Sequence, residues 1–156
     1  MVNQMSGATV MHGSGTIGSS RSGEDLMRIR IVTALAALVS AAVHLILFFD
    51  GYKDVDVIGP AFLTNAVAGV IIAALLLRWH HWIPAFLVAG FGASTLGAFV
   101  LSATVGLFGI HEKWTGGWVL TAAVAEVVCI VGGLVLLSEQ LPLRERLPLR
   151  ERAVRR

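Results

Sequence analysis

The stretch Trp118–Leu137, WVLTAAVAEVVCIVGGLVLL, decides the fold. Its length matches the roughly 20 apolar residues that an α-helix needs to cross the hydrocarbon core of a bilayer. Its one ionisable acid is Glu126. A charged side chain at membrane depth costs about 3 kcal/mol on insertion scales, and such groups normally face the interior of a helix bundle. We therefore expect Glu126 to point inward and to have a polar partner.

The rest of the chain has the same apolar character. Of its 156 residues, 56% are hydrophobic and 14% are charged, and the mean hydropathy is +0.78. A soluble domain has about 25% charged residues, so this composition indicates an integral membrane protein. The sequence contains no basic patch interleaved with aromatic residues, and we expect no nucleic-acid partner.

Three more apolar runs, at residues 31–49, 59–77 and 83–108, precede the run at 118–137. They predict an all-α fold, a bundle of four transmembrane helices with short loops over residues 29–138. Residues 1–28 are rich in Gly and Ser and are expected to be disordered. We interpret Met27 as the true start of translation. A cleaved signal peptide that includes the first run is the less favoured alternative.

The basic residues predict the orientation of the bundle. Ten of the 12 Lys and Arg residues lie in the N-terminal segment, at Arg78 and in the tail 139–156, on one side of the predicted bundle. The positive-inside rule then places both termini in the cytoplasm of a multi-pass protein of the cell membrane. Six tail arginines are expected to bind anionic lipids; they are Arg144, Arg146, Arg150, Arg152, Arg155 and Arg156.

Small residues recur at four-residue spacing in each run and predict the inner faces of the helices. The stripes are Ala36, Ser40 and His44; Ala61, Asn65, Gly69 and Ala73; Ser94, Ala98, Ser102 and Gly106; and Ala122, Glu126, Cys129 and Gly133. Each stripe has a polar residue at similar depth in the outer half of the bundle. These residues form the predicted intramembrane polar cluster of His44, Asn65, Ser102 and Glu126.

The cluster has two interpretations. Polar residues in membrane bundles most often hold helices together, at about 0.6 kcal/mol for each hydrogen bond. A buried Glu–His pair is also a candidate functional site, such as a proton relay, an ion site or a contact for a polar headgroup or quinone. Both interpretations remain open from the sequence.

Other candidate sites have weaker support. Asp50, His111 and Glu112 are candidate metal ligands on the outer side, but no ligand-spacing motif supports them. A haem between His44 and His111 is disfavoured, because His111 lies beyond the end of its span. No Walker loop, nucleophile elbow or HExxH motif occurs, so we expect no cofactor, no metal and no catalytic residue.

The stretch HLILFFDGYKDVDVIGPAFLTNAVAGVIIAALLL, residues 44–77, resembles a group of small four-span integral membrane proteins of actinobacteria. The shared pattern comprises His-Leu, a Gly-Tyr loop, Ile-Gly-Pro, Phe-Leu and Asn-Ala-Val-Ala-Gly, over about a fifth of the chain. The resemblance implies a four-span fold in an actinobacterial envelope, and it implies no activity.

The sequence favours a non-enzymatic function, as a subunit or accessory of an envelope complex or as a homo-oligomer. The alternative is a small proton-coupled carrier that uses Glu126 and His44. A further alternative is a membrane redox or metal-binding protein.

Overall fold

The computed structural model describes residues 17–109, 111 and 115–140. Its elements are α1 (Ile17–Leu47), η1 (Phe48–Tyr52), α2 (Ile58–Arg78), α3 (Trp82–Thr104) and α4 (Gly117–Gln140). Within these residues the chain is all-α, and each of the four long helices has the length and apolar composition of a membrane span. The predicted four-helix fold is confirmed, and the chain is a polytopic membrane protein.

Two predicted boundaries differ from the observed helices. Residues 17–28 were expected to be disordered, but they form the first turns of α1. Their Gly and Ser content lowers helix propensity, yet the long apolar helix that follows supplies the nucleus from which helical turns extend. The third span was expected to reach residue 108, but α3 ends at Thr104. The chain reverses there, with a positive φ of 84° at Gly106.

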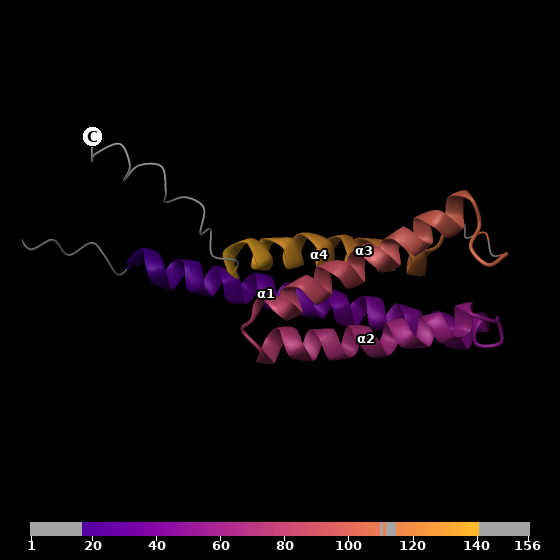
Figure 1. Ribbon diagram of the computed structural model, residues 1–156, viewed down its shortest axis with the longest axis horizontal. Helices are drawn as coiled ribbons and strands as arrows, with labels where there is room; N and C mark the ends of the chain where they lie inside the picture. The colour runs from indigo at the N-terminus through magenta and orange to yellow at the C-terminus, as the bar shows by residue number, and fades with distance from the viewer. Residues whose placement is uncertain (1–16, 110, 112–114, 141–156) are drawn as a thin grey trace, which may run out of the picture.

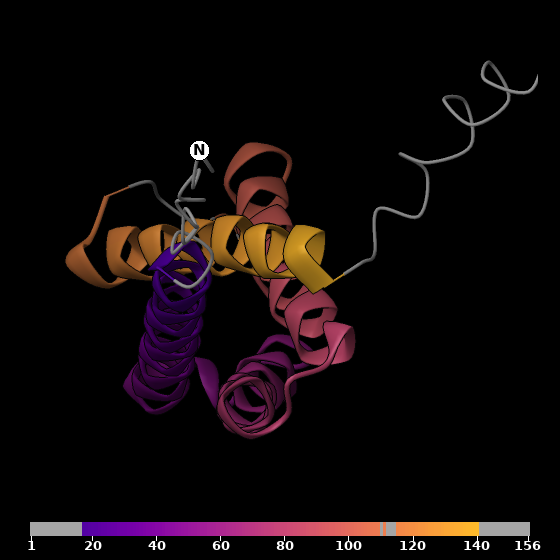
Figure 2. The same cartoon turned by 90° about the vertical axis from the view of Figure 1, so that its left-hand side faces the viewer.

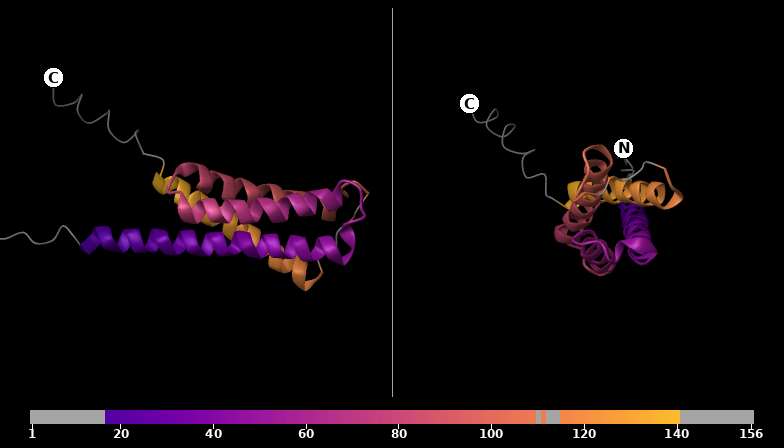
Figure 3. Two further views of the ribbon diagram at one scale, coloured as in Figure 1. Left: turned by 90° about the horizontal axis from the view of Figure 1, so that it is seen from below. Right: turned by 90° about the vertical axis from the view of Figure 1, so that its right-hand side faces the viewer.

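The four helices alternate in direction, so α1 begins and α4 ends at the same end of the bundle (left in Figure 1). The connections η1 with residues 53–57, and the described residues 105–109, 111 and 115–116, lie at the opposite end, which we call the loop end. Neighbouring helices pack in a ring of α1, α2, α3 and α4, while α1 and α3 touch little. The end-on view in Figure 2 shows this ring, and Figure 3 shows α4 lying obliquely across α1.

The helices α2 and α3 are in close contact at the short turn that joins them and diverge toward the loop end (Figures 1 and 2). They share far fewer contacts than α1 with α2 or α3 with α4. The structure is therefore two tightly packed hairpins, joined mainly through α1 and α4.

Small residues bring the helix backbones close together. A Cβ atom added to Gly92 of α3 would lie 2.5 Å from the carbonyl oxygen of Glu126 on α4, and one added to Gly133 would lie 2.8 Å from the amide nitrogen of Ala89. At Gly69 of α2, an added Cβ would lie 3.0 Å from the carbonyl oxygen of Ala37. Such close approach is how membrane helices associate, because lipid provides no hydrophobic driving force between them.

The inner face of α3 differs from the predicted stripe. Ser94 and Ala98 are exposed, whereas Val88, Gly92 and Thr95 are buried. The contact face of α3 is therefore rotated by one residue from the prediction. Ser102 is the member of the predicted stripe that is buried as expected.

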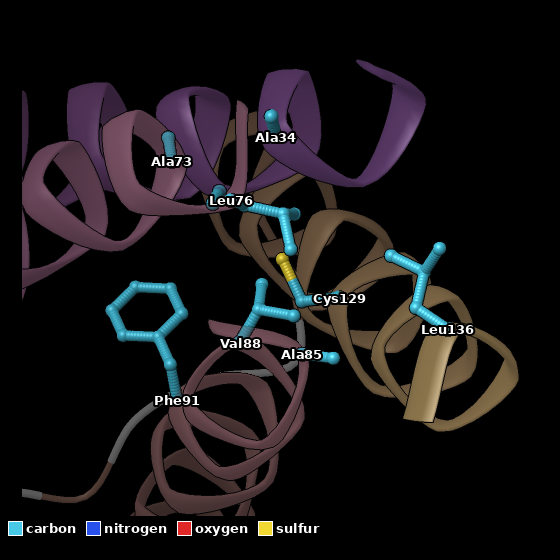
Figure 4. Packing of buried hydrophobic residues seen from close by; sticks show 9 residues of the cluster. Ala34, Ala73, Leu76, Ala85, Val88, Phe91, Cys129 and Leu136 are labelled. Atoms are coloured by element: carbon cyan, nitrogen blue, oxygen red, sulfur yellow. The ribbon is translucent and has the colours of Figure 1, made fainter. Parts of the chain in front are cut away.

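The apolar core occupies the half of the bundle away from the loop end. Figure 4 shows Leu76, Val88 and Cys129 meeting there, with the sulfur of Cys129 directed toward Leu76 and with Leu136 farther along α4. The exposed fraction of each of these side chains is 1% or less. This packing closes that half of the bundle.

One cation is buried beside this core. The guanidinium of Arg30 on α1 donates hydrogen bonds to the carbonyl oxygens of Leu76 (2.7 Å) and Trp79 (3.3 Å). These carbonyl groups lie at the C-terminal end of α2, which lacks intrahelical donors and has a partial negative charge. Arg30 therefore supplies hydrogen-bond donors to the carbonyl groups at the C-terminal end of α2.

Candidate functional site

A cavity of about 360 Å³ lies between the four helices, on the loop-end side of the apolar core. Its walls are formed by the C-terminal end of α1, the N-terminal half of α2, the C-terminal half of α3 and the N-terminal half of α4. It exists because α2 and α3 diverge there. Its volume lies within the range of about 300–1,000 Å³ that is typical of small-molecule sites.

The buried carboxylate of Glu126 lies on the wall of this cavity, with an exposed fraction of 2%. Its Oε1 atom is 4.0 Å from Nε2 of His44 and accepts a hydrogen bond of 3.5 Å from the hydroxyl of Ser40. Both partners belong to α1, where they are four residues apart and share one face. We call Ser40, His44 and Glu126 the acid–imidazole group.

The hydrogen bonds of His44 determine which of its ring nitrogens faces Glu126 as an acceptor. Nδ1 of His44 lies 2.8 Å from the carbonyl oxygen of Ser40. A carbonyl oxygen can only accept, so Nδ1 carries the hydrogen, and Nε2 of the neutral ring has a free lone pair. At this separation of 4.0 Å one proton can reside either on the carboxyl group of Glu126, which gives a neutral pair, or on Nε2, which gives an ion pair. Both forms have no net charge.

The other two members of the predicted cluster also line the cavity, but Asn65 belongs to a separate hydrogen-bonded pair. Its amide nitrogen donates to the hydroxyl of Thr95 on α3 over 3.2 Å, and that hydroxyl also donates to the backbone oxygen of Phe91 over 2.7 Å. Asn65 thus connects α2 to α3, where these helices begin to diverge. Ser102 is buried at the α3 wall.

Aromatic rings line the cavity beside His44. The ring of Phe62 lies between His44 and Tyr52, with centroid distances of 5.2 Å and 4.8 Å. Phe99 of α3 is a further aromatic residue in the wall. The cavity therefore combines a carboxylate, an imidazole and several aromatic faces.

The candidate outer-side ligands do not join this site in the described part of the chain. Asp50 is exposed, and the exposed His111 places its ring against Gly106 rather than beside His44. Glu112 lies outside the described residues. Among residues 17–109, 111 and 115–140, no group of three His, Cys, Asp or Glu side chains is arranged to hold a metal ion. The six tail arginines lie outside the described residues too.

Sequence reasoning missed Thr95, Phe62 and Tyr52 as wall residues. Thr95 was detectable, because Phe91, Thr95 and Ser102 follow the three- and four-residue spacing of one helical face. The aromatic residues had no such signal, since a phenylalanine in an apolar span is most often ordinary packing.

Comparison of the chain with protein-family models, with curated proteins and with solved structures gives no match. The arguments for function therefore rest on the geometry of the cavity.

Proposed function

We propose that the protein is a small proton-coupled carrier whose ligand binds in the intramembrane cavity. The observation that carries this proposal is the position of Glu126 and His44, whose carboxylate and imidazole lie 4.0 Å apart on the wall of a cavity of about 360 Å³. A purely structural pair would be expected in a filled bundle interior. Here the pair borders a space large enough for a ligand, so binding there can change its protonation.

The half of the bundle beyond the cavity supports a carrier with one open side. Leu76, Val88 and Leu136 fill that half and have exposed fractions of 1% or less. The cavity is therefore reached from its own half of the membrane, and the second opening of a transport cycle requires α2 and α3 to separate at their joined end. The predicted orientation, with cytoplasmic termini, places the present opening in the outer half of the cell membrane.

Proton flux across reconstituted liposomes tests this function. With an imposed pH gradient, we expect the wild type to conduct protons at least about tenfold faster than Glu126→Gln, equivalent to about 1.4 kcal/mol. Glu139→Gln is the matched control, because Glu139 is exposed at the end of the same helix. Equal flux in the wild type and Glu126→Gln contradicts the carrier.

The second candidate is an accessory or self-associating subunit of an envelope complex of the actinobacterial type. Gly90 and Gly97 lie on the exposed side of α3, and an added Cβ at either position would meet no atom within 4 Å. Small residues on a lipid-facing surface permit a further helix to pack closely. Co-purification in mild detergent tests this candidate, and recovery of the monomeric chain alone contradicts it.

A further inference from the structure

The charges around the cavity restrict which ligands it can bind. Among the described wall residues, Glu126 and His44 are the acid and base at its centre, and no Lys or Arg is present. The polar groups contributed by α2 and α3 are the neutral side chains of Asn65, Ser94, Thr95 and Ser102. An anionic ligand would face a carboxylate without a fixed cation, which is unfavourable in a medium of low dielectric constant. A cation would be attracted by the carboxylate of Glu126.

The aromatic residues in the cavity wall also favour a cationic ligand. The rings of Phe62 and Tyr52 stack near His44, and Phe99 lies on the α3 side. The faces of aromatic rings attract cations, by up to about 2 kcal/mol where the cation is desolvated. A carboxylate close to aromatic faces is therefore suited to an organic cation that also has apolar surface.

The route into the cavity passes between α2 and α3. Ala61 of α2 and Ser94 and Ala98 of α3 all line the cavity and are exposed. These residues lie where the two helices diverge, within segments long and apolar enough to span a membrane. In a bilayer this opening faces lipid. A ligand that enters by it has to be soluble in the membrane.

We propose that the cavity binds a hydrophobic organic cation of charge +1, which enters from the lipid between α2 and α3. This inference rests on the proposed carrier function and names its ligand class. The exchange balances in charge, because the bound cation takes the place of the one proton that Glu126 or His44 carries. The proton leaves to water, and the carboxylate stays as the counter-ion of the cation.

Binding of the cation should therefore become tighter as the pH rises. Loss of this proton gives the acid–imidazole group a charge of −1, and protons compete with the cation for that state. Among the described residues, the titratable groups near Glu126 are His44 of α1, Cys129 of α4 and Tyr52 of η1, which lines the same cavity. From α2 and α3, the described wall residues present neutral side chains.

A pair of probes with matched shape and opposite charge tests the ligand class. Tetraphenylphosphonium and tetraphenylborate are titrated into the purified full-length protein in detergent, and binding and proton release into weak buffer are both recorded. We expect saturable binding of the phosphonium, with release of up to one proton, and at least about tenfold weaker binding of the borate. Both signals should be lost in Glu126→Gln and retained in Glu139→Gln.

The route is tested with Ala98→Phe, which places a large side chain at the opening and leaves Glu126 itself unchanged. We expect the association rate of the phosphonium to fall about tenfold or more, as it does when access to a site is restricted. Val100→Phe is the control, because Val100 is 40% exposed on the same helix and does not line the cavity. Equal association rates in the two variants overturn entry between α2 and α3.

The outcomes separate this inference from the proposed function. If neither probe binds while proton flux in liposomes still depends on Glu126, the cationic ligand class is wrong and the proposed carrier function is retained. Binding of the borate that is equal to or tighter than that of the phosphonium also overturns the class. If flux does not depend on Glu126, the carrier itself is wrong.

Discussion

The guanidinium of Arg30 on α1 donates a hydrogen bond of 2.7 Å to the carbonyl oxygen of Leu76 on α2. This contact joins two helices beside the apolar core, in the half of the bundle away from the loop end. It also places a buried positive charge at the C-terminus of α2, where the helix dipole is favourable for a cation.

Replacing Arg30 should therefore destabilise the bundle. In Arg30→Met the carbonyl groups of Leu76 and Trp79 lose their donor, and hydrogen bonds to charged groups contribute about 1.5–3 kcal/mol. Thermal unfolding of the purified protein in detergent measures the change. The control is Arg28→Met, because Arg28 is exposed and its nearest acid, Asp25, is 3.9 Å away. The prediction is wrong if both variants lower the melting temperature equally.

Two glycines on α3 should respond in opposite ways to the same substitution. In Gly92→Ala the added Cβ would lie 2.5 Å from the carbonyl oxygen of Glu126, so α3 and α4 have to separate. Overpacking of this kind costs about 1–3 kcal/mol. In Gly90→Ala the methyl group meets nothing within 4 Å, and the gain in helix propensity is up to about 1 kcal/mol. Melting temperatures of the two purified variants should therefore fall and rise, respectively.

The pair formed by Asn65 and Thr95 should hold α2 and α3 together next to the cavity. A double-mutant cycle with Asn65→Leu and Thr95→Val isolates the interaction between the two side chains. We expect a coupling free energy of about 0.6 kcal/mol, the average for interhelical hydrogen bonds in membranes. Unfolding in detergent provides the measurement. Additive effects of the two substitutions would mean that the pair does not stabilise the contact.

The two nitrogens of His44 should have separable roles. Asparagine can replace Nδ1 as a donor to the carbonyl oxygen of Ser40, but it has no group at the position of Nε2. His44→Asn should therefore fold with nearly the stability of the wild type while its proton flux falls about tenfold or more, equivalent to about 1.4 kcal/mol. His44→Gln, whose amide reaches the position of Nε2, is the comparison variant. Retention of full flux in His44→Asn would show that Nε2 takes no part.

Much of the fold could be predicted from the sequence because the length and hydropathy of each apolar run can be read directly from consecutive residues, without knowledge of packing. The runs at 59–77 and 118–137 match α2 and α4 closely for that reason. The inward direction of Glu126 also followed, since a carboxylate facing lipid is costly. The contact of Arg30 with Leu76 could not be predicted, because its acceptor is a backbone carbonyl group and every residue has one.

The inner face of α3 and the presence of the cavity were harder to predict from the sequence. Ser94 and Thr95 are adjacent, and α3 is apolar on all sides, so periodicity does not decide which of the two faces inward. The cavity depends on the divergence of α2 from α3, which follows from packing over the whole bundle. Asn65 lines the cavity together with the other residues of the predicted cluster, and its hydrogen-bond partner is Thr95.

The sparse contact between α2 and α3 has a consequence for assembly in the cell. The contacts within each hairpin are the most extensive between any two helices of the bundle, so each pair of helices can insert and pack as it leaves the ribosome. The covalent link at residues 79–81 mainly keeps the two hairpins close together, while the contacts between α1 and α4 provide most of the packing between them. Two gene fragments divided at His80 and expressed together should therefore reassemble into one complex.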